Sequence, residues 1–272
     1  MTTTLSYSYF LERFLLLVLA VGVVTAEAEP KADRGSVTYL EFADIAPYYY
    51  KRGGGYQGTT VDMVKSLLEP SGYNVKIQMM APERIFNEAL ADNGDVLMLH
   101  TYPGLALEDY PDGMLVCPHK ISRVPIRYYT NNIRYTHMSR EEIVASRIGV
   151  FRYANFQRGF TKGQELNNIT RFNNMRYMYR ALLANRVDVV IAGPYTMRVL
   201  SLEHEAIFPY ELDMDLGFIE GYLAVTKVAE QRLGIYQALC ERASRWDVDE
   251  DFVENIGRHL NAFGNFRANS FE

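Results

Sequence analysis

The segment Gly-Gly-Gly-Tyr-Gln-Gly at residues 53–58 fits the pattern G-x-G-x-x-G letter for letter. In a dinucleotide-binding protein, the glycines of this pattern let the backbone of a helix N-terminus approach the pyrophosphate. That chemistry requires the first glycine to stand directly at the end of a strand. Here some ten residues separate the predicted strand end at Phe42 from Gly53. We therefore interpret the segment as a loop, and we predict no cofactor.

Other residue types that support catalysis do not occur in catalytic patterns. The histidines are scattered and none has the spacing of a metal site; they are His100, His119, His137, His204 and His259. There is no G-x-S-x-G motif. An acidic group at Glu108, Asp109 and Asp112 is interpreted as part of a solvated loop. The sequence thus predicts that the protein is not an enzyme and holds no metal.

Composition and charge limit the number of domains and the kinds of partner that the protein can have. The chain has 272 residues, 48% of them hydrophobic, which suits one large domain or two small ones. The formal net charge is -5 and no basic run is present, so we predict no nucleic-acid partner. Tyrosine is abundant, with 20 residues, and is typical of recognition surfaces. Compositional drift would explain the tyrosine count equally well.

The N-terminus predicts export. Residues 14–24 form an uninterrupted apolar run, which is too short to span a bilayer but suits the core of a signal peptide. The small-x-small pattern Ala26-Glu27-Ala28 follows as a cleavage site, so we assign residues 1–28 to a signal peptide. A buried N-terminal helix is the alternative, and the polar residues 27–36 argue against it. The mature protein is predicted to be periplasmic and soluble.

Behind the candidate loops, strands alternate with helices. Strands are predicted at residues 37–42, 74–80, 95–100, 148–151 and 187–192, and amphipathic helices at 61–68 and after Pro82, Ser139 and Asn173 or Asn174. Residues 88–100 resemble residues 180–192, since each segment is a helix, a turn with asparagine, an aspartate and an apolar strand. This repetition predicts two α/β lobes with mainly parallel sheets flanked by helices. Ligands bind at the carboxyl ends of such strands, so the loops there should line a cleft.

In the order of its motifs the chain resembles the family 3 extracellular solute-binding proteins, which have the type 2 periplasmic-binding fold. The resemblance covers roughly residues 37–260 and is carried by Ala46-Pro47-Tyr48, residues 55–62, Ala89-Leu90 to Gly94-Asp95, residues 148–150, Ala181-Leu182 to Val187-Asp188 and residues 221–226. It implies a discontinuous lobe 1 at residues 37–122 and 218–262, a lobe 2 at residues 123–217, and a two-strand hinge that closes on ligand.

The resemblance also implies a function. Family members deliver small polar solutes to an inner-membrane ATP-driven (ABC) permease, so we expect a monomer that binds a small-molecule ligand and docks on a permease. A sensory protein that feeds a membrane receptor, and an enzyme on the same two-lobe fold, are the alternatives.

Two positions depart from the amino-acid-binding members of the family. Their arginine for the ligand carboxylate is absent from the loop after residue 100, where Leu107 stands near the expected place. Their acidic residue for the ligand ammonium is replaced by Gly193. Because a buried ammonium without a partner is costly, we predict a ligand other than a plain α-amino acid.

The predicted ligand site combines aromatic, hydroxyl, imidazole and charged groups from the loops at strand ends; its members are Tyr48, Tyr49, His100, Thr101, Tyr102, Arg152, Tyr153, Asn155 and Asn174. Each has a structural alternative: a surface tyrosine cluster for Tyr48 and Tyr49, a solvated side chain for Arg152, and a helix cap for Asn174. The two cysteines, Cys117 and Cys240, either form a disulfide, as an oxidising compartment permits, or remain separate buried thiols.

Overall fold

The structure is a computed structural model that describes residues 33–41, 44–91, 96–100, 110, 112–152 and 168–268. The predicted signal peptide at residues 1–28 therefore lies outside the described residues. Within the described part of the chain, no helix combines the length and the apolar character that crossing a membrane requires.

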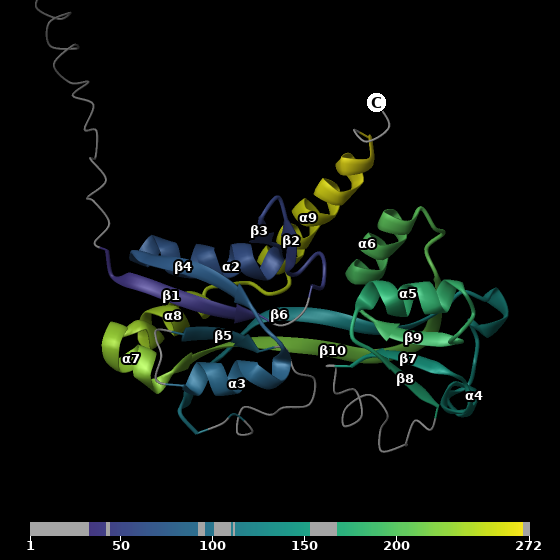
Figure 1. Cartoon of the computed structure of the whole chain (residues 1–272), viewed down its shortest axis with the longest axis horizontal. Coiled ribbons are helices and arrows are strands. Elements are labelled where there is room, and N and C mark those ends of the chain that lie inside the picture. The colour runs from purple at the N-terminus through teal and green to yellow at the C-terminus, as the bar shows by residue number, and fades with distance from the viewer. Residues whose placement is uncertain are drawn as a thin grey trace, which may run out of the picture. The chain divides into compact units, whose positions relative to one another are not determined.

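Strands and helices alternate along much of the chain (Figure 1). The strands are β1 (Gly35–Glu41), β2 (Tyr50–Arg52), β3 (Gly55–Gln57), β4 (Tyr73–Met79), β5 (Val96–His100), β6 (Met114–Thr130), β7 (Ile148–Phe151), β8 (Ile169–Phe172), β9 (Val189–Ala192) and β10 (Tyr210–Thr226). The helices are α2 (Thr59–Leu68), α3 (Pro82–Leu90), α4 (Arg140–Ala145), α5 (Met175–Leu183), α6 (Pro194–His204), α7 (Lys227–Leu233), α8 (Ile235–Ala243) and α9 (Asp251–Ala268), with 3-10 turns at Glu69–Ser71 and Ile133–Tyr135.

Eight strands are hydrogen-bonded in the order β4-β1-β5-β10-β6-β9-β7-β8. At one end β1 pairs in parallel with β4 and β5, and at the other β7 pairs in parallel with β8 and β9. Between these groups lie β10 and β6, which are antiparallel to each other and to the groups that they join. The strand order confirms the α/β class, and each group provides the parallel strands that the sequence predicts.

The long strands β6 and β10 connect the two groups. Each has 17 residues, enough to extend about 55 Å, and they run side by side through both groups (Figure 1). Their pairing passes from Ile219–Val124 to Gly221–Ser122, and the register shifts directly afterwards, at Tyr222. The two predicted sheets therefore share β6 and β10, and hydrogen bonding is continuous across the predicted hinge.

Helices cover both faces of the β4-β1-β5 group. Tyr39 and Leu40 are adjacent on β1 and so point to opposite faces. Tyr39 packs in a cluster with Leu67 of α2 and Leu239 of α8, whereas Leu40 packs in a cluster with Ile85 of α3. The amphipathic pattern at residues 61–68 thus predicts its helix correctly.

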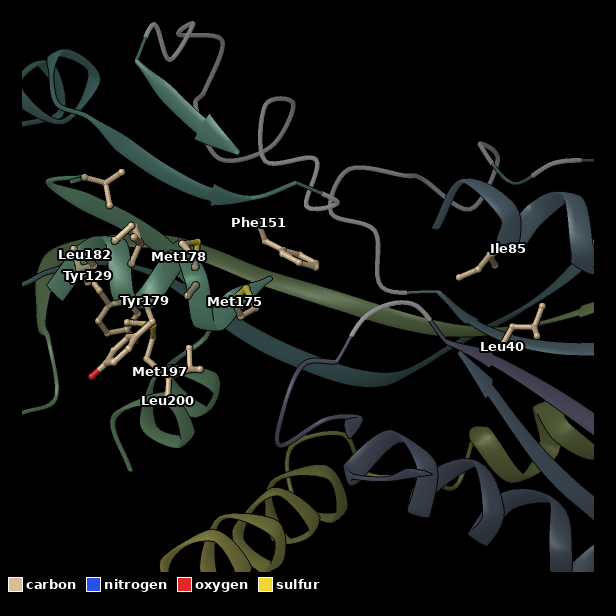
Figure 2. Close-up of a cluster of buried hydrophobic side chains, with 14 of the residues drawn as sticks. Leu40, Ile85, Tyr129, Phe151, Met175, Met178, Tyr179, Leu182, Met197 and Leu200 are labelled. Atoms are coloured by element: carbon tan, nitrogen blue, oxygen red, sulfur yellow. The ribbon is translucent and has the colours of Figure 1, made fainter. Parts of the chain in front are cut away.

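The second group is covered in the same way. Ile191 of β9 packs in a cluster with Ile143 of α4, and its neighbour Val190 packs in another with Met178 and Leu182 of α5. Figure 2 shows these α5 side chains gathered in one buried cluster with residues of α6. The methionine and tyrosine stripe of α5 is therefore core, as its helical spacing indicates.

The glycine-rich segment forms a hairpin. Gly53 and Gly54 make the turn between β2 and β3, with φ of 59° and 84°, a region that glycine adopts without strain. A hairpin turn is not the strand-to-helix junction that a dinucleotide pattern requires.

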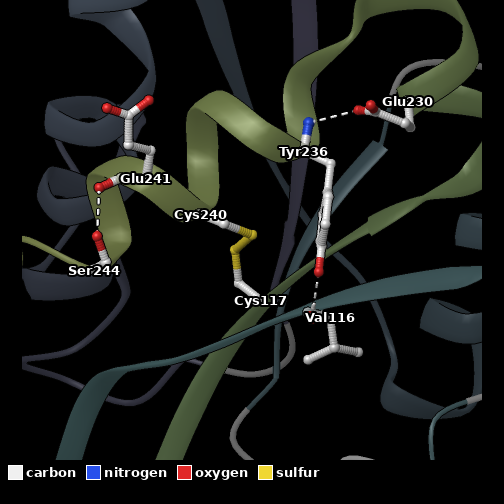
Figure 3. Close-up of a disulfide and its surroundings, with 7 residues drawn as sticks. All are labelled: Val116, Cys117, Glu230, Tyr236, Cys240, Glu241 and Ser244. Atoms are coloured by element: carbon white, nitrogen blue, oxygen red, sulfur yellow. Dashed lines mark hydrogen bonds between the residues drawn. A yellow bond between two sulfur atoms is a disulfide. The ribbon is translucent and has the colours of Figure 1, made fainter.

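The cysteines are joined in a disulfide. Cys117 of β6 bonds to Cys240 of α8, a sequence separation of 123 residues (Figure 3). Beside it, the hydroxyl of Tyr236 donates to the carbonyl of Val116 at 3.1 Å. The alternative of two separate thiols is therefore wrong. By chain entropy, a loop of this length corresponds to about 4–5 kcal/mol of stabilisation.

Candidate functional site

The carboxyl ends of the parallel strands carry the loops that the sequence singles out. The loop from Asp44 to Tyr50 follows β1, and Gly193 to Tyr195 follow β9. In open α/β sheets ligands lie beyond these ends. The geometry of the site is therefore built from these two loops and from the adjoining stretch of β6.

Backbone contacts fix the loop after β1. Its carbonyl groups at Pro47 and Tyr48 accept hydrogen bonds from the N–H groups of Thr59 and Thr60, at 3.1 and 3.0 Å. Gly58 makes this approach possible, because any side chain there would overlap the carbonyl of Tyr48. The last glycine of the glycine-rich segment therefore positions the tyrosine loop against α2.

Tyr48 lies between the loop after β9 and the C-terminal helix. Its ring stacks on Phe252 of α9 at 6.2 Å between centroids, and its side chain is buried. Its hydroxyl lies beside Gly193, since a Cβ at Gly193 would stand 3.4 Å from this oxygen and 3.0 Å from Cγ1 of Val124. Burial raises the pKa of the Tyr48 hydroxyl well above its usual value, so this group stays a protonated donor.

Four buried polar atoms near these loops have no hydrogen-bond partner among the described residues. They are Oδ1 of Asp44, the hydroxyl of Tyr48, Oγ of Ser122 and Nε of Arg123. A buried polar group without a partner costs about 1–3 kcal/mol, so each calls for an explanation. Ser122 and Arg123 lie on β6 where its register with β10 changes. Two of the four atoms therefore belong to the loop after β1, and two belong to β6, which lies between the two parallel groups.

An ion pair connects the loop after β1 with α5. Nη1 of Arg176 lies 3.1 Å from Oδ2 of Asp44, and its Nε and Nη2 contact both carboxylate oxygens of Glu203 at 2.8 and 2.9 Å. Hydrogen bonding to Glu203 raises the pKa of Arg176 above its usual value. Arg176 therefore stays charged and joins elements 132 residues apart.

The predicted site residues have different outcomes. Tyr48 and Tyr49 are buried, at 6% and 4% exposure, so they do not form a surface cluster. Asn174 caps α5 by accepting from the backbone N–H groups of Arg176 and Tyr177 at 2.8 and 3.4 Å, as its structural alternative predicts.

The other predicted residues are described in part or not at all. Arg152 is exposed, and its backbone N–H donates to Phe172 at 2.8 Å. The backbone of His100 ends β5, opposite Tyr222. The remaining four lie outside the described residues: Thr101, Tyr102, Tyr153 and Asn155. A ligand role for all nine positions stays a prediction.

Sequence reasoning missed Asp44, Ser122, Arg123 and Arg176. For Asp44 a signal was available, since an acid between a strand end and the tyrosine loop stands at the expected binding edge. Arg123 packs its guanidinium over the ring of Phe218 at 3.8 Å and faces Asp249 at 3.6 Å. No local pattern reveals these pairings. Among the described residues, no group of three or more metal-ligating side chains is found.

Comparisons with known proteins identify the fold. No protein-family model and no curated protein matches the sequence. Among solved structures, the chain is similar to the amino acid ABC transporter substrate-binding protein AbpA from Streptococcus pneumoniae bound to L-arginine, with TM-score 0.65, 12% identity and coverage of 86% of this chain and 97% of that chain.

Two further solved structures are similar to the chain. The VFT2 domain of BvgS from Bordetella pertussis matches with TM-score 0.64 and 12% identity over 83% of this chain and 93% of that chain. The ancestral amino-acid-binding protein AncCDT-1, a precursor of cyclohexadienyl dehydratase, matches with TM-score 0.62 and 14% identity over 82% and 96%. The chain has the two-lobed fold of the periplasmic binding proteins.

Proposed function

We propose that the chain is an exported solute-binding protein that captures a small polar solute between two lobes and delivers it to an ABC-type permease. The observation that carries this proposal is the set of buried polar atoms without a partner among the described residues, two in the loop after β1 and two on β6, in a chain with a binding-protein fold. A bound solute would supply the missing partners. The chain binds its solute without converting it and acts as a monomer.

The course of β6 and β10 supports a division into two lobes. We place lobe 1 at residues 37–122 and 218–262 and lobe 2 at residues 123–217. Both boundaries fall within the long strands, the one on β6 opposite the register shift at Tyr222 and the one on β10 at the irregularity between Asp215 and Phe218. In this arrangement Asp44 and Arg176 belong to different lobes, so their ion pair joins the proposed lobes.

The solute is not a plain α-amino acid. At Gly193, where the resemblance leads us to expect an acid for the ligand ammonium, Tyr48 and Val124 leave no room even for a Cβ without adjustment. A neutral tyrosine hydroxyl can hydrogen-bond a solute but cannot neutralise an ammonium. The group at this place is therefore suited to a neutral or anionic part of the solute.

Export is supported by the disulfide. Cys117 and Cys240 are paired, and structural disulfides are typical of oxidising compartments. This agrees with a signal peptide at residues 1–28 and a periplasmic location.

A thermal-shift screen tests the function. Small carboxylates, amines, peptides, sugars and α-amino acids are added to the mature protein, and stabilisation of about 2.7 kcal/mol is expected at 100 times Kd. Replacement Arg152→Ala should abolish the shift by an anionic solute, and an unchanged shift would remove Arg152 from the site. Product formation from the stabilising solute would instead identify an enzyme.

A sensory role is the second candidate, because the fold is shared with a domain of BvgS. Co-purification from membranes separates the two roles. A permease is expected as the partner, and recovery of a receptor kinase would favour the sensor.

A further inference from the structure

A groove of about 650 Å³ lies between α5 and β8, the strand at the end of the sheet. Its volume falls within the roughly 300–1,000 Å³ of small-molecule sites. On the strand side it is lined by Thr170 and Phe172, which are two residues apart and so share a face. It contains none of the residues around Tyr48 and is therefore separate from the proposed solute site.

On the helix side, the groove is lined by one aromatic ring and by two small alanine side chains. The lining residues of α5 are Tyr177, Arg180 and Ala181, which recur at helical spacing, and Ala184 is the C-cap of this helix. Tyr177 is 62% exposed, so its ring is accessible from the groove side of the helix. The two alanines leave room beside this ring for a flat group.

Arg180 is held in place by a neighbouring histidine. Its Nε donates to Nε2 of His204 at 3.0 Å. The other ring nitrogen of His204 lies 2.9 Å from the carbonyl of Leu200. A carbonyl only accepts, so this nitrogen carries the proton and Nε2 is the acceptor for Arg180. The guanidinium of Arg180 is therefore oriented before any ligand arrives.

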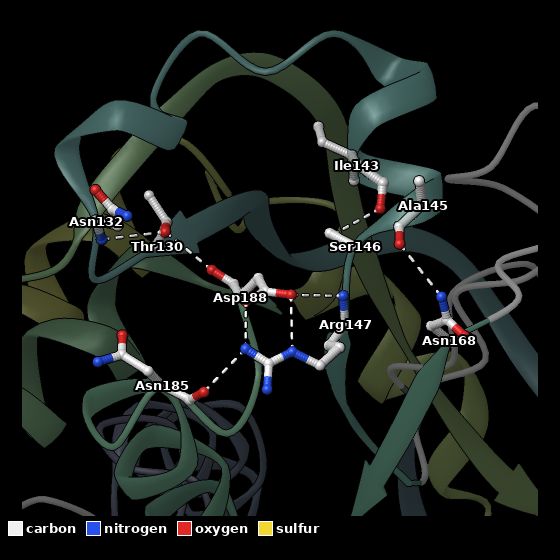
Figure 4. A network of polar contacts seen from close by, with 9 residues as sticks. All are labelled: Thr130, Asn132, Ile143, Ala145, Ser146, Arg147, Asn168, Asn185 and Asp188. Atoms are coloured by element: carbon white, nitrogen blue, oxygen red, sulfur yellow. Dashed lines mark hydrogen bonds and ion pairs between the residues drawn. The ribbon is translucent and has the colours of Figure 1, made fainter.

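Arg186 belongs to a turn whose backbone is held by hydrogen bonds from neighbouring residues. Arg147 contacts both carboxylate oxygens of Asp188 at 2.6 and 3.0 Å and donates to the carbonyl of Asn185 at 3.0 Å (Figure 4). The N–H of Arg186 donates to the carbonyl of Ala181 at 2.8 Å. Asp188 is thus engaged by Arg147, and none of the described residues that line the groove carries a carboxylate.

We propose that this groove binds a small aromatic carboxylate. The carboxylate is held by Arg180 and Arg186, and the ring lies against Tyr177 above the alanines. The guanidinium of Arg180 is oriented by His204, and the side chain of Arg186 is exposed. Two guanidiniums attract an anion and can bind its planar group through paired hydrogen bonds. The exposed ring supplies a stacking surface. This ligand is bound independently of the solute between the lobes.

Benzoate is the probe, and the full mature protein is titrated by calorimetry and saturation-transfer NMR. Arg180→Gln with Arg186→Gln should weaken benzoate binding about tenfold or more. Tyr177→Ala should weaken it about fivefold. The matched control is Arg171→Gln, on the same strand between Thr170 and Phe172 but on its other face, and it should leave the affinity within about twofold. Arg186→Gln alone is the second variant if the double variant fails to fold.

Each outcome decides the proposal. Loss of benzoate binding in the double variant, with binding kept in Arg171→Gln, supports it. Absence of benzoate binding, equal affinity in all variants, or equal binding of the neutral isostere benzamide overturns it. Binding of polyglutamate without benzoate also overturns it, in favour of an acidic protein partner.

Discussion

Two buried regions, a first around Cys117 and a second around Tyr48, differ in whether their polar groups are hydrogen-bonded. Around the disulfide, the hydroxyl of Tyr236 and the indole N–H of Trp246 donate to backbone carbonyls at 3.1 and 3.0 Å. Around Tyr48, the hydroxyl of Tyr48 and Oγ of Ser122 have no partner among the described residues. The polar groups of the first region are paired within the protein, whereas we propose that those of the second region bind the solute.

Breaking the disulfide should have the largest effect on stability. Cys117→Ser with Cys240→Ser removes a cross-link across 123 residues and should lower the free energy of unfolding by about 4–5 kcal/mol. Urea unfolding with and without reductant measures it, because reductant should change only the wild-type protein. A loss below about 1 kcal/mol would mean that the first region does not depend on the disulfide.

Gly193→Ala tests how tightly the second region is packed. The added Cβ would lie 3.0 Å from Cγ1 of Val124, so the substitution should lower the free energy of unfolding by about 1–3 kcal/mol and weaken the binding of the solute. The control is Gly264→Ala on α9. The added Cβ would have no atom within 4 Å apart from its own helix, and the higher helix propensity of alanine should raise the free energy of unfolding by up to about 1 kcal/mol. Equal effects of the two changes would contradict the packing at Gly193.

Tyr48→Phe and Tyr236→Phe compare the regions directly. Tyr236→Phe loses a hydrogen bond and should cost about 1 kcal/mol in the free energy of unfolding. Tyr48→Phe removes a hydroxyl without a partner and should leave the solute-free protein equally stable or up to about 1 kcal/mol more stable. Chemical denaturation measures both, and destabilisation by Tyr48→Phe would show that its hydroxyl is already paired.

The smallest expected effect is on how the free energy of unfolding depends on pH. Hydrogen bonding from Arg147 lowers the pKa of Asp188, so its stabilisation is present above the unfolded pKa and is lost as the pH falls through the folded one. In Asp188→Asn, the free energy of unfolding should decline less between about pH 6 and about pH 3 than in the wild type. Identical declines would show that the pair does not contribute.

The sequence predicts the fold well where burial is local. Helical spacing locates α2 and α5, and the capping box of Ser139 and Glu142 is present at α4. It does not predict the full length of β6, because Pro118 and Pro125 interrupt the pattern of a central strand. Gly234, with φ of 60°, separates α7 from α8.

The candidate site is less predictable for a physical reason. Residue type and loop position suffice to select Tyr48 and Gly193. The burial of Tyr48, however, depends on Phe252, about 200 residues away, and the contact of Asp44 with Arg176 depends on how the loop after β1 meets α5. Such long-range packing leaves no periodic trace in the sequence.

The most direct test of the account is a calorimetric titration of the best solute from the screen into wild-type protein, Tyr48→Phe and Tyr236→Phe. If the partnerless hydroxyl of Tyr48 binds the solute, Tyr48→Phe should raise Kd about tenfold, whereas Tyr236→Phe should leave Kd within about twofold. An unchanged Kd in Tyr48→Phe would contradict a solute site at the strand ends around Tyr48.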